Sequence, residues 1–243
     1  MLEPLFMFGL ILAYIWKLRF IYPSCWIVIP VLMLLSHLIR RESPRALGFR
    51  TDNLTDHLKE FALLLIPIVL ALLAGGAWFH TFRRIGFDDI LLSLAAYLPW
   101  GLVQEYALNG YFLNRFDQRL SRRAASVLAA LLFCAAHAPN YFLMAVTLPL
   151  AWCATVVYRR TRNLYVLGVA HAIIGLMLFL VVPDSISHHL RVGPGYLQFH
   201  HVHLRGPGAV AGEGDLGFIR RPGRVRVSPL RTIDGVGGGF HPT

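Results

Sequence analysis

Charged residues are scarce in this sequence. They make up 15% of its 243 residues, and only 13 residues are acidic, whereas soluble domains carry about 25% charged residues. Hydrophobic residues account for 56%, and the mean hydropathy is +0.56. Several apolar runs approach or exceed the roughly 18 residues that are needed to cross a bilayer. The composition therefore excludes an ordinary soluble domain and predicts a polytopic helical membrane protein.

Cysteine is also rare, which limits disulfide and metal chemistry. The three cysteines, Cys25, Cys134 and Cys153, show no CxxC spacing and all lie in apolar segments. They are typical of small core hydrophobes in a reducing or membrane setting. The first apolar run lacks a preceding basic region and a small-residue cleavage site, so we expect a retained first helix rather than a signal peptide.

Turn-forming and charged stretches divide the apolar sequence into about seven segments. We predict an all-α transmembrane helical bundle with spans at residues 2–16, 21–38, 61–79, 90–113, 124–137, 141–158 and 164–182. Lys and Arg number twelve in the connectors after the second, fourth and sixth spans, against four in the other connectors. The positive-inside rule then predicts a cytoplasmic N-terminus.

The distribution of Lys and Arg as topology signals also explains the formal net charge of +10. Arginines gather in short clusters between apolar runs, at residues 40–50, 115–123 and 159–162, as topology signals do. We therefore expect no nucleic-acid partner.

The composition changes after residue 186. Residues 187–243 contain twelve glycines and no apolar run of helix length. Such a segment lacks the apolar surface to bury a core. We predict a transmembrane helical domain at residues 1–186 and a disordered Gly/Arg/His-rich C-terminal tail at residues 187–243, to which we assign no function.

Few polar side chains interrupt the apolar spans. Glu105 lies in the middle of the stretch 98–116, with Gln104 beside it and Asn109 one turn later on the same helix face as Glu105. An acidic residue at the centre of a membrane helix costs about 3 kcal/mol, so a functional role is the default interpretation of Glu105. His137 and His171 lie in two later apolar segments.

Each of these residues also has a structural interpretation. Glu105 can be a hydrogen-bonding group paired with an arginine near the cytoplasmic end, and each histidine alone is more often a satisfied interior residue. Together, Glu105, His137 and His171 can activate a water molecule or hold a divalent metal such as zinc. Because the sequence contains no HExxH motif, no cofactor is certain and the metal stays one alternative.

Three short stretches, QEYALNGYFLNRF, FCAAH and HAIIG, resemble the motifs of the CPBP family, the CAAX-processing and bacteriocin-processing intramembrane proteases. The family pattern is EExxxR, FxxxH and HxxxN or HxxxD, and the resemblance covers about residues 88–183. It implies a membrane-embedded endopeptidase in which Glu105 and His137 activate a water and His171 stabilises the oxyanion. The supporting motif positions are Gln104, Asn109, Phe133 and Gly175.

The chain departs from the family pattern at three positions. Gln104 stands in place of the first glutamate, Asn109 in place of the arginine, and Gly175 in place of the final Asn or Asp. Three functions therefore stay open: a protease with Glu105 as its base, a catalytically inactive CPBP-like membrane protein of scaffold or bacteriocin-immunity type, and a proton-coupled transporter. The resemblance implies a protein or peptide substrate in the membrane, with or without a lipid group, membrane lipids as neighbours, and an integral protein of the bacterial inner (plasma) membrane.

Overall fold

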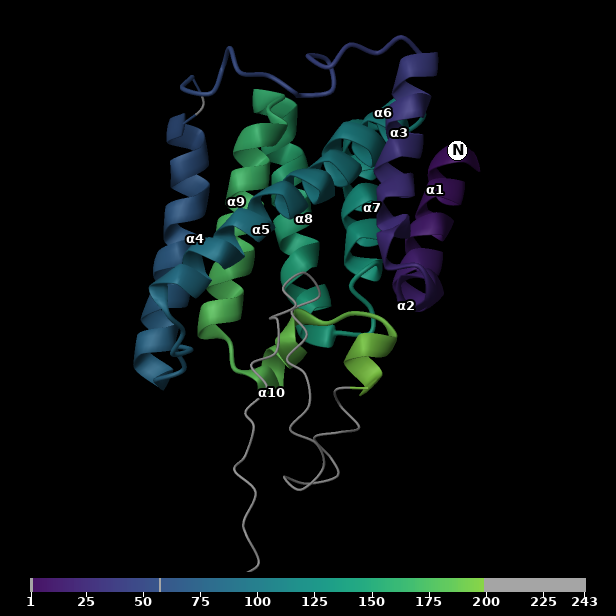
Figure 1. Cartoon of the computed structure of the whole chain (residues 1–243). Coiled ribbons are helices and arrows are strands. Elements are labelled where there is room, and N and C mark those ends of the chain that lie inside the picture. Colours follow the sequence, from purple (N-terminus) through teal and green to yellow (C-terminus); the bar gives the residue numbers. More distant parts are fainter. Residues whose placement is uncertain (1, 57, 199–243) are drawn as a thin grey trace, which may run out of the picture. The chain divides into compact units, whose positions relative to one another are not determined.

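The computed structural model describes residues 2–56 and 58–198, which lie in the first of two compact units of the chain, Met1–Ala211. The second unit, Gly212–Thr243, lies outside the described residues, as does the predicted tail from residue 199 onward. Within the described ranges the chain is helical and contains no strand, which confirms the all-α prediction. The elements, most of them labelled in Figure 1, are α1 Leu2–Ala13, η1 Tyr14–Leu18, α2 Arg19–Ile21, η2 Pro23–Ile27, α3 Val28–Ile39, α4 Leu58–Phe79, α5 Phe87–Glu105, η3 Tyr106–Leu113, α6 Asn114–Asp117, α7 Arg122–Ala135, α8 Tyr141–Thr161, α9 Leu164–Val181, α10 Asp184–Ser187 and η4 His188–Leu190.

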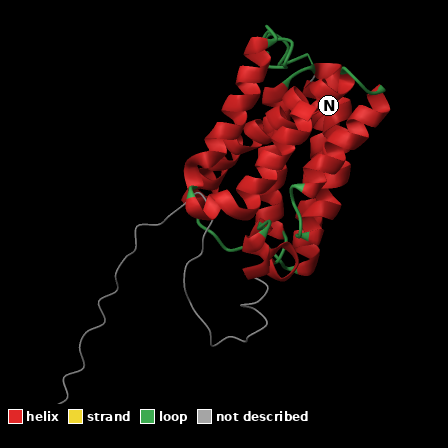
Figure 2. Cartoon of the chain, turned by 90° about the vertical axis from the view of Figure 1, so that its right-hand side faces the viewer, coloured by secondary structure: helices red, strands yellow, loops and turns green. Residues whose placement is uncertain are grey.

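Four of the described helices are long and apolar enough to cross a membrane: Leu2–Ile21, Phe61–Phe79, Tyr141–Thr161 and Leu164–Val181. Pro23–Ile39 is a shorter apolar helix. The other two predicted spans correspond to α5, which carries two aspartates in its first turn, and to α7, which has only 14 residues. The loops lie at the two ends of the helices (Figure 2). These apolar helices indicate an integral membrane protein with four candidate long spans and further, shorter helices in the described residues.

The helix α7 ends earlier than predicted. Its last residue is Ala135, so His137 lies in the turn that follows and not inside the span expected at 124–137. The backbone N–H of Ala138 donates to the carbonyl of Ala135 at 3.1 Å, which closes the turn. Pro139 has no N–H to continue a helix, and Asn140 then caps α8 through its side chain.

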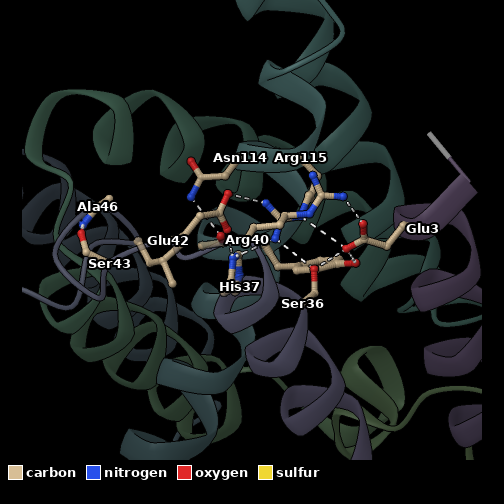
Figure 3. Close-up of polar contacts among 12 residues, drawn as sticks. Glu3, Ser36, His37, Arg40, Glu42, Ser43, Ala46, Asn114 and Arg115 are labelled. Atoms are coloured by element: carbon tan, nitrogen blue, oxygen red, sulfur yellow. Dashed lines mark hydrogen bonds and ion pairs between the residues drawn. The ribbon is translucent and has the colours of Figure 1, made fainter.

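A buried arginine connects the N-terminal helices to the core. Arg115 on α6 is 3% exposed and donates to Glu42 Oε1 at 2.7 Å and to Ser36 Oγ at 3.0 Å. Its Nε lies 3.4 Å from Glu3 Oε1 on α1. Figure 3 shows these side chains converging on the guanidinium group from α1, α3 and the connector after α3. Two carboxylates and a hydroxyl thus compensate the burial of one positive charge.

The connector between α3 and α4 is anchored on the turn between α8 and α9. Gly48 has φ +95°, and a Cβ at this position would lie 2.8 Å from Cε2 of Tyr158. Its carbonyl accepts from the backbone N–H of Leu164 at 2.8 Å, and the carbonyl of Leu47 accepts from the Tyr158 hydroxyl at 2.9 Å. The tight approach and the positive φ both require glycine at this position.

Helical segments continue past residue 186, where we predict the end of the transmembrane domain. α10 and η4 follow Pro183, and residues 194–198 are also helical. The Asn140 side chain donates to the backbone carbonyls of Ser187 and Arg191 at 2.9 and 3.0 Å. The glycine-rich composition of this segment predicts disorder. Composition does not show, however, that a residue elsewhere in the chain binds the backbone carbonyls of this segment.

Candidate active site

The buried end of α5 brings a carboxylate, an amide and an imidazole into one hydrogen-bonded group. Glu105 is only 4% exposed. Its Oε1 lies 2.9 Å from Nδ1 of His171 on α9, and its Oε2 accepts a 2.8 Å hydrogen bond from Asn109. The alternative pairing of Glu105 with an arginine is not formed between described residues, since Glu105 binds His171 and Arg115 binds Glu42.

Two glycines allow α5 and α9 to approach closely enough for this contact. A Cβ at Gly101 would lie 2.7 Å from the carbonyl oxygen of Gly168, and a Cβ at Gly168 would lie 2.9 Å from Cα of Leu102. Small residues at a crossing let the backbones of two membrane helices come together. Glu105 follows Gly101 by four residues and His171 follows Gly168 by three, so each lies about one turn beyond the crossing.

The helix changes its geometry immediately after Glu105. Tyr106–Leu113 is a π-helix, a rare conformation that is frequent at functional sites. Asn109 lies inside it and is fully buried. While its Nδ2 binds Glu105, its Oδ1 is buried with no hydrogen-bond partner in the part of the chain that the structure describes.

Phe133 brings the second histidine to the same region. Its ring centroid lies 4.9 Å from the ring of His137 and 6.0 Å from the ring of His171, edge to face in the second pair. Nδ1 of His137 lies 2.7 Å from the backbone carbonyl of Phe133. A carbonyl can only accept, so Nδ1 donates and Nε2 carries the lone pair of the neutral ring. The structure therefore places both motif histidines against one phenylalanine.

The two remaining motif positions lie apart from this hydrogen-bonded group. Gln104 is half-buried, and no side-chain hydrogen bond of it occurs among the described residues. A Cβ at Gly175 would lie 3.2 and 3.3 Å from two ring carbons of Tyr97, so this ring packs where a larger third-motif side chain would begin. Sequence reasoning missed Tyr97. Its position four residues before Gly101, on the face of α5 that meets α9, is the signal that could have identified it.

The alternative of a metal site stays a prediction. No group of three or more His, Cys, Asp or Glu side chains between residues 2 and 198, residue 57 aside, is placed to hold a metal ion. Glu105, His137 and His171 therefore do not form a common ligand set in this arrangement. The contacts that are present are those of a carboxylate–imidazole pair with a second imidazole nearby.

A protein-family model matches the part of the chain that contains these residues. Residues 86–177 match the family model described as Type II CAAX prenyl endopeptidase Rce1-like. None of the curated proteins and none of the solved structures compared with the chain matches it. The matched range contains Glu105, His137 and His171 and runs from the start of α5 into α9. The match covers 92 of the 243 residues, and within that range the chain is similar to the CAAX-processing type of intramembrane protease, in agreement with the resemblance of its motifs to the CPBP family.

Proposed function

We propose that this protein is an intramembrane endopeptidase of the CAAX-processing type, which hydrolyses a peptide bond with a water activated by Glu105 and histidine. The observation that carries the proposal is the buried 2.9 Å contact between Glu105 and His171 inside the range that matches the protease family. General-base catalysis needs a proton acceptor within hydrogen-bond reach of the attacking water. A paired carboxylate and imidazole can supply such an acceptor.

The tautomer of His171 follows from its partner. A carboxylate oxygen of Glu105 accepts from Nδ1–H of His171, and in that tautomer Nε2 carries the lone pair. We therefore assign His171 to the base and not to the oxyanion role that the family resemblance implies: the pair takes a proton from water, and the hydroxide then attacks the carbonyl carbon of the substrate. Glu105 stabilises the imidazolium that forms, and the proton passes to the leaving amine.

His137 and Asn109 support this pair in different ways. Nε2 of His137 carries a lone pair, because its Nδ1 is bound to the carbonyl of Phe133. We assign His137 the role of orienting the attacking water and assisting its deprotonation. Asn109 holds the second oxygen of Glu105 and so limits the rotation of the carboxylate.

A specific observation favours a second candidate, a catalytically inactive CPBP-like membrane protein. Gly175 supplies no side-chain donor beside His171, and the ring of Tyr97 packs against it. Oxyanion stabilisation by a single donor is worth about 10²–10³ in rate, so its loss would weaken catalysis. A scaffold or bacteriocin-immunity role would need the fold but not the proton-transfer groups.

A cleavage assay separates the two candidates. The purified full-length protein in lipid nanodiscs is given a quenched fluorescent peptide ending in a prenylated CAAX sequence, alongside the same peptide without the prenyl group. We expect Glu105→Gln, His137→Ala and His171→Ala each to lower the rate by about 10²–10⁴-fold. The controls Asp88→Asn, at an exposed carboxylate on the same helix, and His80→Ala, at an exposed histidine, should keep full activity.

Full activity in Glu105→Gln would remove this residue from the mechanism, and absence of cleavage by the wild type under all conditions would favour the inactive relative. The same assay tests the metal alternative, since loss of activity with a chelator and recovery with zinc would require a metal.

We also propose that the substrate is a membrane protein or peptide and that the N-terminus is cytoplasmic in a bacterial inner membrane. The two peptides test whether a lipid group is needed.

A further inference from the structure

The turn that carries His137 is hydrogen-bonded to the segment that follows α9. Residues 183–198, which we call the C-terminal brace, contain α10 and η4 and follow α9. Asn140 is fully buried, and its Nδ2 donates to two carbonyls of the brace, those of Ser187 and Arg191. The backbone N–H of Gly193 donates to the carbonyl of Ala138 at 2.8 Å. Three hydrogen bonds thus join the brace to residues 138–140.

These contacts bear directly on His137. The backbone N–H of Asn140 donates to the carbonyl of His137 at 3.0 Å, and the N–H of His137 donates to the carbonyl of Cys134 at 2.9 Å. His137 is therefore held between the last turn of α7 and the residue that binds the brace. Any movement of Asn140 is transmitted to the His137 backbone through a single short turn.

The brace is itself packed against the N-terminal helices. Gly193 has φ +59°, and a Cβ there would lie 2.9 Å from Cγ2 of Ile15 and 3.1 Å from its carbonyl oxygen. A Cβ at Gly195 would lie 3.2 Å from a guanidinium nitrogen of Arg19. The brace thus lies between the His137 turn and residues 15–19, so it cannot move away from the turn without leaving η1.

From this arrangement we infer that Asn140 is a positioning residue for His137, acting through the C-terminal brace. The inference rests on the proposed function, because it assumes that His137 takes part in proton transfer. Asn140 touches no reacting atom. It sets where the imidazole stands relative to Glu105 and His171, and displacement of a catalytic group by about 1 Å can cost about 10²-fold in rate.

A matched control exists one helix later. Asn163 is also fully buried and caps α9, as Asn140 caps α8. Each asparagine makes three side-chain hydrogen bonds, and each accepts from a backbone N–H at 3.1 Å. Nδ2 of Asn163 donates to the carbonyl of Arg50 and to the side chain of Asn53, both in the connector before α4. The two asparagines therefore differ mainly in the segment that they hold.

The experiment compares Asn140→Ala with Asn163→Ala in the full-length protein in nanodiscs. Both variants lose a helix cap and two donor contacts, so we expect similar losses of thermal stability. Hydrogen exchange of the backbone amides at residues 136–140 should rise only in Asn140→Ala, and that at residues 48–53 only in Asn163→Ala. In the cleavage assay, kcat should fall about 10–100-fold in Asn140→Ala with KM within about twofold, while Asn163→Ala keeps its kcat within about threefold.

A second variant keeps the inference testable if Asn140→Ala does not fold. Gly193→Ala strains the brace against Ile15 without changing the cap of α8, and it should raise exchange at residues 136–140 and lower kcat in the same way. The inference is overturned if exchange at residues 136–140 does not change in either variant, or if it rises while kcat equals that of Asn163→Ala. Absence of cleavage by the wild type would instead overturn the proposed function, and the exchange data would still decide whether Asn140 anchors the turn.

Discussion

The crossing of α5 and α9 provides the sharpest test of how the site is built. Replacing Gly101 with alanine would place a Cβ 2.7 Å from the carbonyl oxygen of Gly168 and 3.1 Å from the backbone nitrogen of Ala172. Both are main-chain atoms, which cannot rotate out of the way, and ordinary contacts begin near 3.4 Å. The two helices must therefore separate by about 0.7 Å, and overpacking of this kind costs about 1–3 kcal/mol.

The same separation acts on the contact between Glu105 and His171 one turn away. If it is transmitted in full, the distance between Glu105 and His171 grows from 2.9 Å to about 3.6 Å, which is no longer a hydrogen bond. We therefore expect Gly101→Ala to lower the thermal stability and to reduce the cleavage rate by up to about 10²-fold. Gly168→Ala should behave alike, because its Cβ would meet the backbone of Leu102.

Gly75 on α4 is the matched control, since a Cβ there would have nothing within 4 Å. Gly75→Ala should be neutral or stabilising by up to about 1 kcal/mol, because alanine favours a helix more than glycine does. Thermal unfolding and cleavage are measured for all variants in the same nanodiscs. If Gly101→Ala is as stable and as active as Gly75→Ala, the close crossing does not position the site and the reasoning fails.

Two further predictions concern the connector after α3. Gly48→Ala should destabilise the protein by about 2 kcal/mol relative to Gly75→Ala, because φ is +95° and the new Cβ would lie 2.8 Å from the Tyr158 ring; an unchanged unfolding temperature would contradict this. Burial alone would raise the pKa of Glu42, but hydrogen bonds from Arg115 and His37 outweigh it and hold the pKa below its ordinary value of 4.5. The stability that Glu42 contributes is therefore present above about pH 4.5 and lost as the pH falls through the lowered pKa. The difference in Tm between the wild type and Glu42→Gln should shrink from pH 7 toward pH 3, and a difference that grows on acidification would refute the assignment.

Part of the site follows from the sequence alone. The spacing of Glu105 and Asn109 predicts that they share a helix face, and the 2.8 Å hydrogen bond between them confirms it. The helical class was equally predictable, because the composition leaves few other ways to satisfy the backbone in a membrane. Both features depend on local periodicity, which the sequence displays directly.

Other features depend on contacts between distant segments. A glycine in an apolar helix is compatible with a crossing, a bend or open lipid, and only the structure pairs Gly101 with Gly168 while leaving Gly75 free of contacts. Likewise, the two hydrogen bonds that Asn140 donates to the brace join it to residues 47 and 51 positions later in the chain. No property of residues 187–198 themselves indicates that Asn140 is their partner.

The energetics of the buried polar group distinguish a functional from a structural origin. If Glu105 served only to hold α5 against α9, an apolar pair of the same size would do so without the cost of burying a carboxylate. The group is also incompletely satisfied, since Oδ1 of Asn109 is buried without a partner among the described residues. A partly satisfied polar network stabilises a protein less than an apolar core does. Glu105, Asn109 and His171 therefore contribute less to stability than an apolar contact would, which is consistent with the proton-transfer role that we propose for Glu105 and His171.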